Sequence, residues 1–239
     1  MNRIIVAHRE KAITRAATAL ARVLISAHRH PILFLVSGGS AFLLLDHLPL
    51  SVFGRALTVG VLDERYSRIR AVNNFLQLKA TRFYKRAKSR GVQWIKTVPA
   101  KGETLAHFSR RFEGALRAWK KAHPEGRIVA TLGMGADGHT VGIMPYPEAP
   151  QRFRQLFGNP LQWVVGYDTK KKNPYPLRAT TTLSFLQREV DSAVALVCGM
   201  EKSDAFGRVN AKRGNLAQTP MRIIHAMKHV QLFTDLLSF

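Results

Sequence analysis

The chain has 239 residues, of which 46% are hydrophobic and 22% are charged. This is an ordinary globular composition, so it excludes a disordered chain and a fibrous repeat. The 37 Lys and Arg residues outnumber the 15 Asp and Glu residues and give a formal net charge of +22. A charge of this size attracts nucleic acids, acidic membrane surfaces or phosphorylated metabolites, without saying which of them is bound.

The chain carries few signals for export or for membrane insertion. Its single cysteine, Cys198, lies in an apolar run, which excludes an intramolecular disulfide and a multi-cysteine zinc site. The first residues lack the apolar core of a signal peptide. The most apolar stretch, residues 31–50, is interrupted by a Ser-Gly-Gly-Ser sequence and by Asp46 and His47, which argues against a membrane span. We therefore expect a cytoplasmic protein without a membrane segment; its oligomeric state stays open.

Apolar periodicity predicts an alternation of helices and buried strands. In chain order these are a helix over 9–27, a strand over 32–36, a helix over 41–48, a strand over 56–62, helical residues over 76–90, a helix over 103–121 and a strand over 127–132. Further strands are predicted over 162–167, 180–185, 193–197 and 229–233. The alternation is typical of an α/β protein with a mostly parallel sheet and helices on both faces. We expect residues 1–239 to form one domain, and a small additional subdomain stays open.

Two predicted strands end in loops that are candidates for ligand binding, at the sheet edge where α/β proteins bind ligands. Ser37, Gly38, Gly39 and Ser40 precede a predicted helix. Backbone amides there favour an anion such as phosphate, although a tight turn with a serine N-cap gives the same pattern. The second loop, 63–65, reads Asp-Glu-Arg. It suits substrate hydroxyls or acid–base chemistry, or it is a solvated turn with a surface ion pair.

A third loop, residues 133–139, matches the G-x-G-x-x-G pattern of dinucleotide sites. Three prolines within 139–150 oppose the helix that such a site needs, so we reject a nucleotide cofactor. The loop also carries Asp137 and His139, a carboxylate and an imidazole two residues apart. This pair suits proton transfer near neutral pH; a histidine that only binds backbone is the alternative.

Two cationic residues in the second half of the chain are candidates for phosphate binding. Arg178 opens a predicted strand and could bind a phosphate in a bidentate manner. Lys202 begins a predicted helix behind a strand and could supply a second contact. An ordinary surface lysine is the alternative reading of Lys202.

Taken together and in this order, these segments resemble the 6-phosphogluconolactonase family, which is related to the glucosamine-6-phosphate isomerases and deaminases. The matching segments are 36–40, 63–65, 132–140, 178–183 and 199–202, and the third is the most specific. The resemblance implies a modified Rossmann-like α/β fold that uses no nucleotide. It also implies hydrolysis of 6-phosphoglucono-1,5-lactone to 6-phosphogluconate in the pentose phosphate pathway, with a phosphorylated sugar lactone as substrate and with no metal or organic cofactor.

The same resemblance implies a role for each candidate residue. His139 would be the general base that activates water, and Asp137 would orient it. Asp63 and Arg65 would line the sugar-acid part of the pocket, with Arg65 close to the developing oxyanion. Asn74 matches an asparagine that follows the family's Asp-Glu-Arg motif. The phosphate would be held by Ser37, Gly38, Gly39, Ser40, Arg178 and Lys202.

The related deaminases are the first alternative. They carry a glutamate after the histidine loop, whereas this chain has Met144 there and only a displaced Glu148. Two departures from the lactonase pattern keep an inactive or repurposed homologue open. Acidic residues of the family are replaced by arginines within 66–74, and Met144-Pro145-Tyr146 replaces the usual Phe-Pro-Gly.

Two alternatives belong to other classes of protein. A nucleic-acid-binding protein would use the basic segment 79–90, where one helix would place Lys79, Arg82, Arg86 and Arg90 on one stripe. We keep non-specific polyanion binding as a secondary property. A serine hydrolase based on Ser37 would need a Gly-x-Ser-x-Gly elbow, which the chain lacks at this position.

Overall fold

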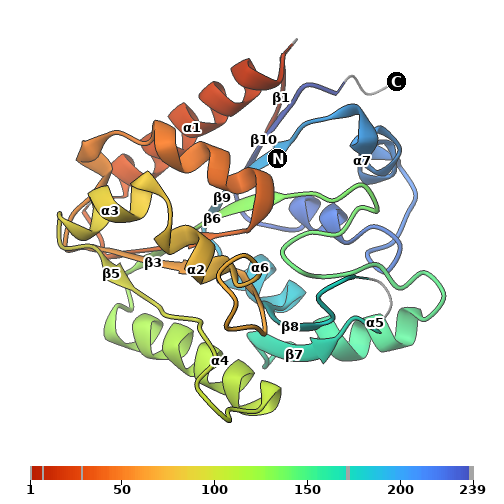
Figure 1. Cartoon of the computed structure of the whole chain (residues 1–239). Coiled ribbons are helices and arrows are strands. Elements are labelled where there is room, and N and C mark those ends of the chain that lie inside the picture. The colour runs from red at the N-terminus through yellow and green to blue at the C-terminus, as the bar shows by residue number, and fades with distance from the viewer. Residues whose placement is uncertain (1, 7, 28, 171–172, 237–239) are drawn as a thin grey trace.

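The computed structural model describes residues 2–6, 8–27, 29–170 and 173–236, which form two sheets of different kinds (Figure 1). Main-sheet strands are β1 (Asn2–Ile5), β2 (Ile32–Val36), β3 (Leu57–Val61), β5 (Gln93–Trp94), β6 (Arg127–Gly133), β9 (Ser192–Val197) and β10 (Val230–Thr234). They pair in parallel in the order β1-β10-β9-β6-β2-β3-β5. The small sheet is antiparallel, with the order β4-β8-β7, and consists of β4 (Asp63–Arg65), β7 (Val164–Asp168) and β8 (Leu177–Thr181).

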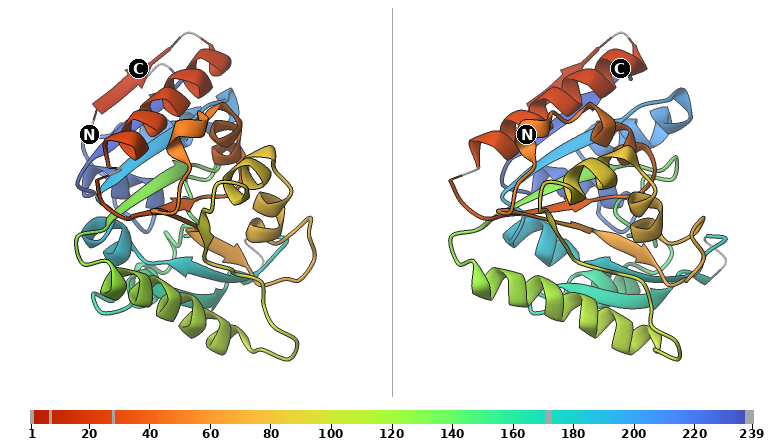
Figure 2. Two further views of the ribbon diagram at one scale, coloured as in Figure 1. Left: turned by 90° about the vertical axis from the view of Figure 1, so that its left-hand side faces the viewer. Right: turned by 60° about the vertical axis from the view of Figure 1, so that its left-hand side comes forward.

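Helices cover both faces of the main sheet, as predicted. The α-helices are α1 (Arg9–Ser26), α2 (Asn74–Lys79), α3 (Arg82–Lys88), α4 (Leu105–Ala122), α5 (Pro150–Phe157), α6 (Leu183–Arg188) and α7 (Ser203–Asn210). The 3₁₀ segments are η1 (Gly39–His47), η2 (Leu50–Val52), η4 (Met200–Lys202) and η5 (Pro220–His225). Figure 2 shows α1 on one side of the main sheet and the small sheet with α4 on the other. None of the described helices combines the length and apolarity that a bilayer crossing requires.

The central strands come from the continuous apolar runs of the sequence. Every residue of β2 and β3 is buried. Strands covered on both faces have no solvent side, so their sequences do not alternate between apolar and polar residues. Because these runs are bounded by polar loops, the predicted strands 32–36 and 56–62 match the structure closely, and the helix predicted over 41–48 is present as the 3₁₀ segment η1.

Two of the predicted elements were wrong. Residues 180–185 do not form one strand, because β8 ends at Thr181 and the Thr182 hydroxyl caps α6 by accepting a hydrogen bond from the Phe185 N–H. Residues 76–90 do not form one helix. The Thr81 hydroxyl caps a new helix, α3, after α2 has ended. The stripe of Lys79, Arg82, Arg86 and Arg90 is therefore split between two helices, and Arg90 lies beyond the second one.

Candidate active site

Four loops meet at one edge of the main sheet. They follow the carboxyl ends of β2, β3, β6 and β9, which are neighbours in the order β9-β6-β2-β3. A cavity of about 280 Å³ opens where these loops converge. Ten of the eleven predicted site residues line it, namely Ser37, Gly38, Gly39, Ser40, Asp63, Arg65, Asn74, His139, Arg178 and Lys202. The remaining one, Asp137, lies behind His139 and contacts its ring.

His139 and Asp137 form a hydrogen-bonded pair at the cavity. The Nδ1 atom of His139 lies 2.5 Å from an oxygen of Asp137, and the same oxygen accepts the His139 backbone N–H at 3.1 Å. Partial burial acts to raise the pKa of Asp137, but the hydrogen bonds and charge of His139 outweigh it and lower that pKa. An ionised Asp137 is an acceptor, so it holds the proton of His139 on Nδ1 and leaves Nε2 free to accept another.

Gly135 gives one glycine of this loop a structural role beside His139. A Cβ atom at Gly135 would lie 2.1 Å from Cε1 and 2.2 Å from Nδ1 of His139. The imidazole therefore packs directly on the backbone of Gly135, and any side chain there would displace it. Gly135, one of the glycines that match the dinucleotide pattern, thus makes room for the His139 ring.

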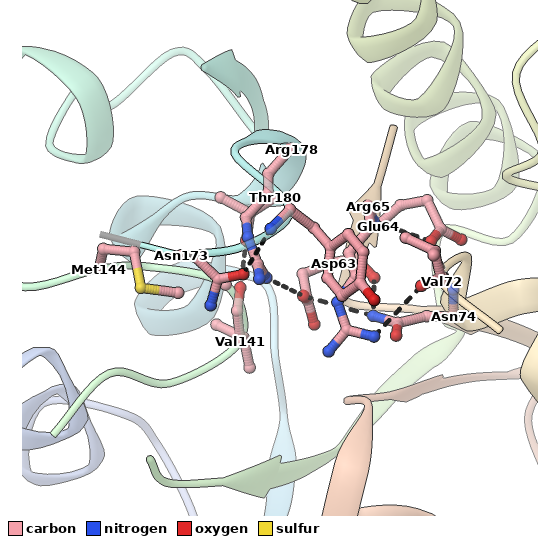
Figure 3. A network of polar contacts seen from close by, with 12 residues as sticks. Asp63, Glu64, Arg65, Val72, Asn74, Val141, Met144, Asn173, Arg178 and Thr180 are labelled. Carbon is pink, nitrogen blue, oxygen red and sulfur yellow. Dashed lines mark hydrogen bonds and ion pairs between the residues drawn. The ribbon is translucent and has the colours of Figure 1, made fainter. Parts of the chain in front are cut away.

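The Asp-Glu-Arg segment forms β4, and strand alternation separates its side chains. Asp63 and Arg65 share the face that lines the cavity, and Glu64 points to the other side. Asp63 is buried and pairs with Arg178, whose Nη1 atom lies 3.5 Å from Oδ2. The Asn74 amide donates to the Asp63 carbonyl at 2.9 Å. Figure 3 shows Asp63 between Arg178 and Asn74.

Glu64 is fully buried, and it was not among the predicted site residues. Its carboxyl accepts hydrogen bonds from the backbone N–H groups of Arg65, Asn74 and Phe75 and from the Thr97 hydroxyl, at 2.6–3.0 Å. Burial raises the pKa of Glu64 to about 8, although these hydrogen bonds favour the ionised form. Glu64 thus ties β4 to the first turn of α2 and fixes where Arg65 and Asn74 stand.

Four buried polar atoms around the cavity have no hydrogen-bond partner among the described residues. They are Ser37 Oγ, Asn74 Oδ1 and the Nε atoms of Arg65 and Arg178. Leaving a buried donor or acceptor unpaired costs about 1–3 kcal/mol each, so the structure carries an energetic cost around this cavity. Because Ser37 Oγ has no partner, the described residues contain no Ser37–His139 dyad of the kind that a serine hydrolase requires.

Sequence reasoning missed several residues that line the cavity. Val141 and Gly142 follow the histidine loop, and Asn173 comes from the segment between β7 and β8. Neither Met144 nor Glu148 is among the described residues that line it. Asn173 lies in no recognisable motif, whereas the position of Val141 and Gly142 directly after His139 was a usable signal. Among the described residues, no three His, Cys, Asp or Glu side chains are grouped as metal ligands.

The fold and the cavity define an α/β protein with a basic, glycine-lined site at the carboxyl edge of its parallel sheet. A family model described as glucosamine-6-phosphate isomerases/6-phosphogluconolactonase matches residues 7–233, so the chain belongs to this family. No curated protein matches the sequence.

Solved structures with similar folds include a 6-phosphogluconolactonase from Shewanella baltica OS155, with 18% identity and a TM-score of 0.79 over 98% of this chain and 97% of that one. A putative 6-phosphogluconolactonase from Neisseria gonorrhoeae FA 1090 has 22% identity and a TM-score of 0.76 over 98% and 99%. A 6-phosphogluconolactonase from Trypanosoma brucei has 17% identity and a TM-score of 0.75 over 98% and 95%. At these identities the likeness shows a shared fold.

Proposed function

We propose that this chain hydrolyses 6-phospho-D-glucono-1,5-lactone to 6-phosphogluconate, a step of the pentose phosphate pathway. One observation carries the proposal: the Asp137–His139 pair faces a cavity that also holds Arg65, Arg178 and Lys202. A general base beside a cationic cavity is the arrangement that hydrolysis of a phosphorylated ester requires. The family membership and the similar folds of 6-phosphogluconolactonases support the same substrate.

The reaction follows from the geometry of the pair. His139 Nε2 removes a proton from water, and the water oxygen attacks the lactone carbonyl carbon. Arg65 stabilises the negative charge on the carbonyl oxygen. The bond to the ring oxygen then breaks and the ring oxygen takes the proton back from His139, which gives a hydroxyl group and a carboxylic acid. The acid releases its remaining proton to solvent and becomes a carboxylate. No covalent enzyme intermediate is needed, and Asp137 holds the imidazole throughout.

Phosphate binding supplies the positioning. The phosphate is held by the glycine loop of Gly38, Gly39 and Ser40 together with Lys202 and Arg178. The Nη1 atom of Arg178 pairs with Asp63, which holds the guanidinium at the wall of the cavity. Binding a remote dianion aligns the lactone with the water, which raises the rate without a nucleophilic side chain.

The deaminase reaction is a poorer fit to this cavity. Met144 is buried where the deaminases carry a glutamate, and Glu148 is absent from the described lining. Asp63 is the one carboxylate among the described residues that line the cavity. The site therefore lacks the acid that would help to open a sugar ring.

The test is a coupled assay with freshly generated lactone, run beside glucosamine-6-phosphate and corrected for spontaneous hydrolysis. We expect lactone hydrolysis without release of ammonia. His139→Ala should lower kcat by about 10²- to 10⁴-fold, the usual contribution of a general base. Ser37→Ala should retain far more turnover than His139→Ala. Ammonia release, or loss of turnover in Ser37→Ala alone, would contradict the proposal.

A second property, non-specific polyanion binding, is favoured by the distribution of charge. Residues 65–102 contain no Asp or Glu and supply eleven basic residues, half of the net charge. Nine of them are exposed: Arg68, Arg70, Lys79, Arg82, Lys85, Lys88, Arg90, Lys96 and Lys101. Binding to generic duplex DNA should fall steeply as salt is raised, because each phosphate contact releases a counterion. Absence of binding at low salt would exclude it.

A further inference from the structure

A tight turn follows the catalytic histidine and lines the cavity. The Ile143 N–H donates to the Thr140 carbonyl at 2.7 Å, and the two residues between them, Val141 and Gly142, have φ values of +42° and +74°. Two successive positive φ values define a type I′ turn, whose usual residues are Asn and Gly. A β-branched residue such as Val141 is rarely found there, so the surrounding structure must hold the turn in place.

Two hydroxyl groups of the small sheet hold this turn. Thr180 on β8 donates to the Val141 carbonyl, and Tyr167 on β7 donates to the Gly142 carbonyl. Both side chains are buried, at 0% and 4% exposure. Figure 3 shows Val141 next to Thr180. The carbonyl groups of the turn are therefore directed into the small sheet.

The direction of the Gly142 N–H follows from that of the Val141 carbonyl. Both belong to one peptide unit, and the described residues contain no cis peptide bond. In a trans peptide the C=O and N–H groups point in opposite directions, so the Gly142 N–H points away from Thr180. This N–H has no acceptor among the described residues, and Gly142 lines the cavity.

A side chain cannot occupy the position of Gly142. A Cβ atom there would lie 2.9 Å from Oδ2 of Asp63, and the φ of +74° disfavours any other residue. The backbone of the turn therefore packs directly against Asp63 at the wall of the cavity. A free main-chain N–H at a cavity is a group with which proteins bind a developing oxyanion.

We propose that the Gly142 N–H donates a hydrogen bond to the carbonyl oxygen of the lactone as it becomes an oxyanion, and that Thr180 is the positioning residue that aims it. The inference rests on the proposed function and adds a main-chain donor to Arg65. His139 stands three residues earlier in the same loop, so one loop carries both the base and the donor. The small sheet then acts on the reaction through a hydroxyl that never touches substrate.

The test compares Thr180→Val, which keeps the shape and removes the hydroxyl, with Thr180→Ser, which restores it. An oxyanion-hole donor is worth about 10²- to 10³-fold in kcat. We expect Thr180→Val to lower kcat at least about tenfold with KM within about twofold, because the donor is misaimed rather than removed. Thr180→Ser should recover most of kcat. Tyr167→Phe removes the second hydroxyl that holds the turn, and we expect it to lower kcat by less. This variant tests the inference if Thr180→Val does not fold.

A binding experiment separates this inference from the proposed function. In ¹⁵N-glycine-labelled protein, 6-phosphogluconate should shift the amide resonance of Gly142 in the wild-type chain and in Thr180→Ser, and less in Thr180→Val. If the wild-type chain hydrolyses the lactone and Thr180→Val matches it in kcat, the inference is wrong and the proposed function stands. If the wild-type chain hydrolyses no lactone, the proposed function fails and the donor role fails with it. In a chain that does hydrolyse the lactone, an unmoved Gly142 amide overturns the donor role and leaves the proposed function standing.

Discussion

The main sheet and the small sheet contribute to the cavity in opposite ways. The main sheet is apolar along its central strands, and its candidate site side chains, such as those of Ser37, His139 and Lys202, follow the ends of its strands. The small sheet carries its functional side chains inside the strands, with Asp63 and Arg65 on β4 and Arg178 on β8. The main sheet thus contributes residues that follow its strands, and the small sheet contributes charged residues within its strands.

Because of this difference, we expect substitutions of charged residues in the small sheet to lower the free energy of unfolding most. Buried charges are tolerated only when they are paired and hydrogen-bonded, and breaking one pair leaves its partner uncompensated. Arg65 and Arg178 also stand directly opposite each other in the β4–β8 register. Like charges in that position oppose pairing unless an anion lies nearby, so the small sheet depends on the Asp63 carboxylate.

We therefore expect the largest loss of stability when the ion pair between Asp63 and Arg178 in the small sheet is broken. Arg178→Met leaves the buried Asp63 without its cation and should lower the free energy of unfolding by about 3–5 kcal/mol. Urea denaturation measures it. The double variant Asp63→Asn with Arg178→Met should recover part of the loss, because no lone charge remains. If the double variant is less stable than Arg178→Met, the pair is not what makes Arg178 important.

In the loops of the main sheet, by contrast, we expect a substitution beside His139 to lower kcat and to leave the free energy of unfolding unchanged. Gly135→Ala should push the His139 ring away from its position and lower kcat by about 10²-fold, since a displacement of about 1 Å in a catalytic group has this effect. Gly114→Ala in α4 is the control, because a Cβ atom there meets nothing within 4 Å. Equal kcat values for the two variants would show that the Gly135 contact does not position His139.

The same division explains what could be predicted from the sequence. The central strands were predictable because β2 and β3 are continuous apolar runs, and the loops at their ends were predictable because their motifs match a family. In the small sheet β7 matches the strand predicted over 162–167, but β4 and the bounds of β8 were not predicted, because β4 is only three residues long and three of the five β8 residues are polar. A threonine cap at Thr182 ended β8 where β propensity continued. Strand β1, strand β5 and helix α5 also lacked a clear periodic signal.

The site was predicted more completely than the sheet that supports it. Glu64 and Thr180 lie within matching segments, but their role, like that of Tyr167, is a hydrogen bond to a backbone group, which a sequence motif does not show. Their partners lie 10 to 39 positions away in sequence, so only the folded chain brings them together.

A smaller effect is expected from Glu64, and it depends on pH. Because the folded-state pKa is raised to about 8 from an ordinary value of 4.5, the folded chain binds more protons than the unfolded chain between these values. Its contribution to the free energy of unfolding is therefore largest below pH 4.5 and declines as pH rises towards 8. Glu64→Gln should flatten this part of a plot of Tm against pH. It should also cost about 1–3 kcal/mol, because an amide cannot accept all four hydrogen bonds.

The outcome for Glu64 is judged against a matched variant. Glu103→Gln changes a carboxyl that lies near the surface, and its pair with Arg111 lowers its pKa to about 2. The slope of Tm between pH 4.5 and 8 should stay the same in Glu103→Gln. If Glu64→Gln also keeps the wild-type slope, Glu64 is ionised throughout this range and its hydrogen bonds outweigh its burial.

The smallest effect is expected where α4 meets the small sheet. The Nη2 atom of Arg117 lies 2.7 Å from Oε1 of Glu113, and its Cζ atom lies 4.4 Å from the centroid of the Trp163 ring. However, 45% of the Arg117 side chain is exposed. An exposed ion pair contributes about 0–1 kcal/mol, so Arg117→Ala should change the free energy of unfolding by about 1 kcal/mol or less. Glu113→Ala should cost more, because Glu113 also accepts the N–H groups of Trp163 and Val164 where β7 begins. If Arg117→Ala proves the more damaging of the two, the small sheet is held to α4 by the exposed cation and its ring contact, and the backbone amides of β7 contribute little.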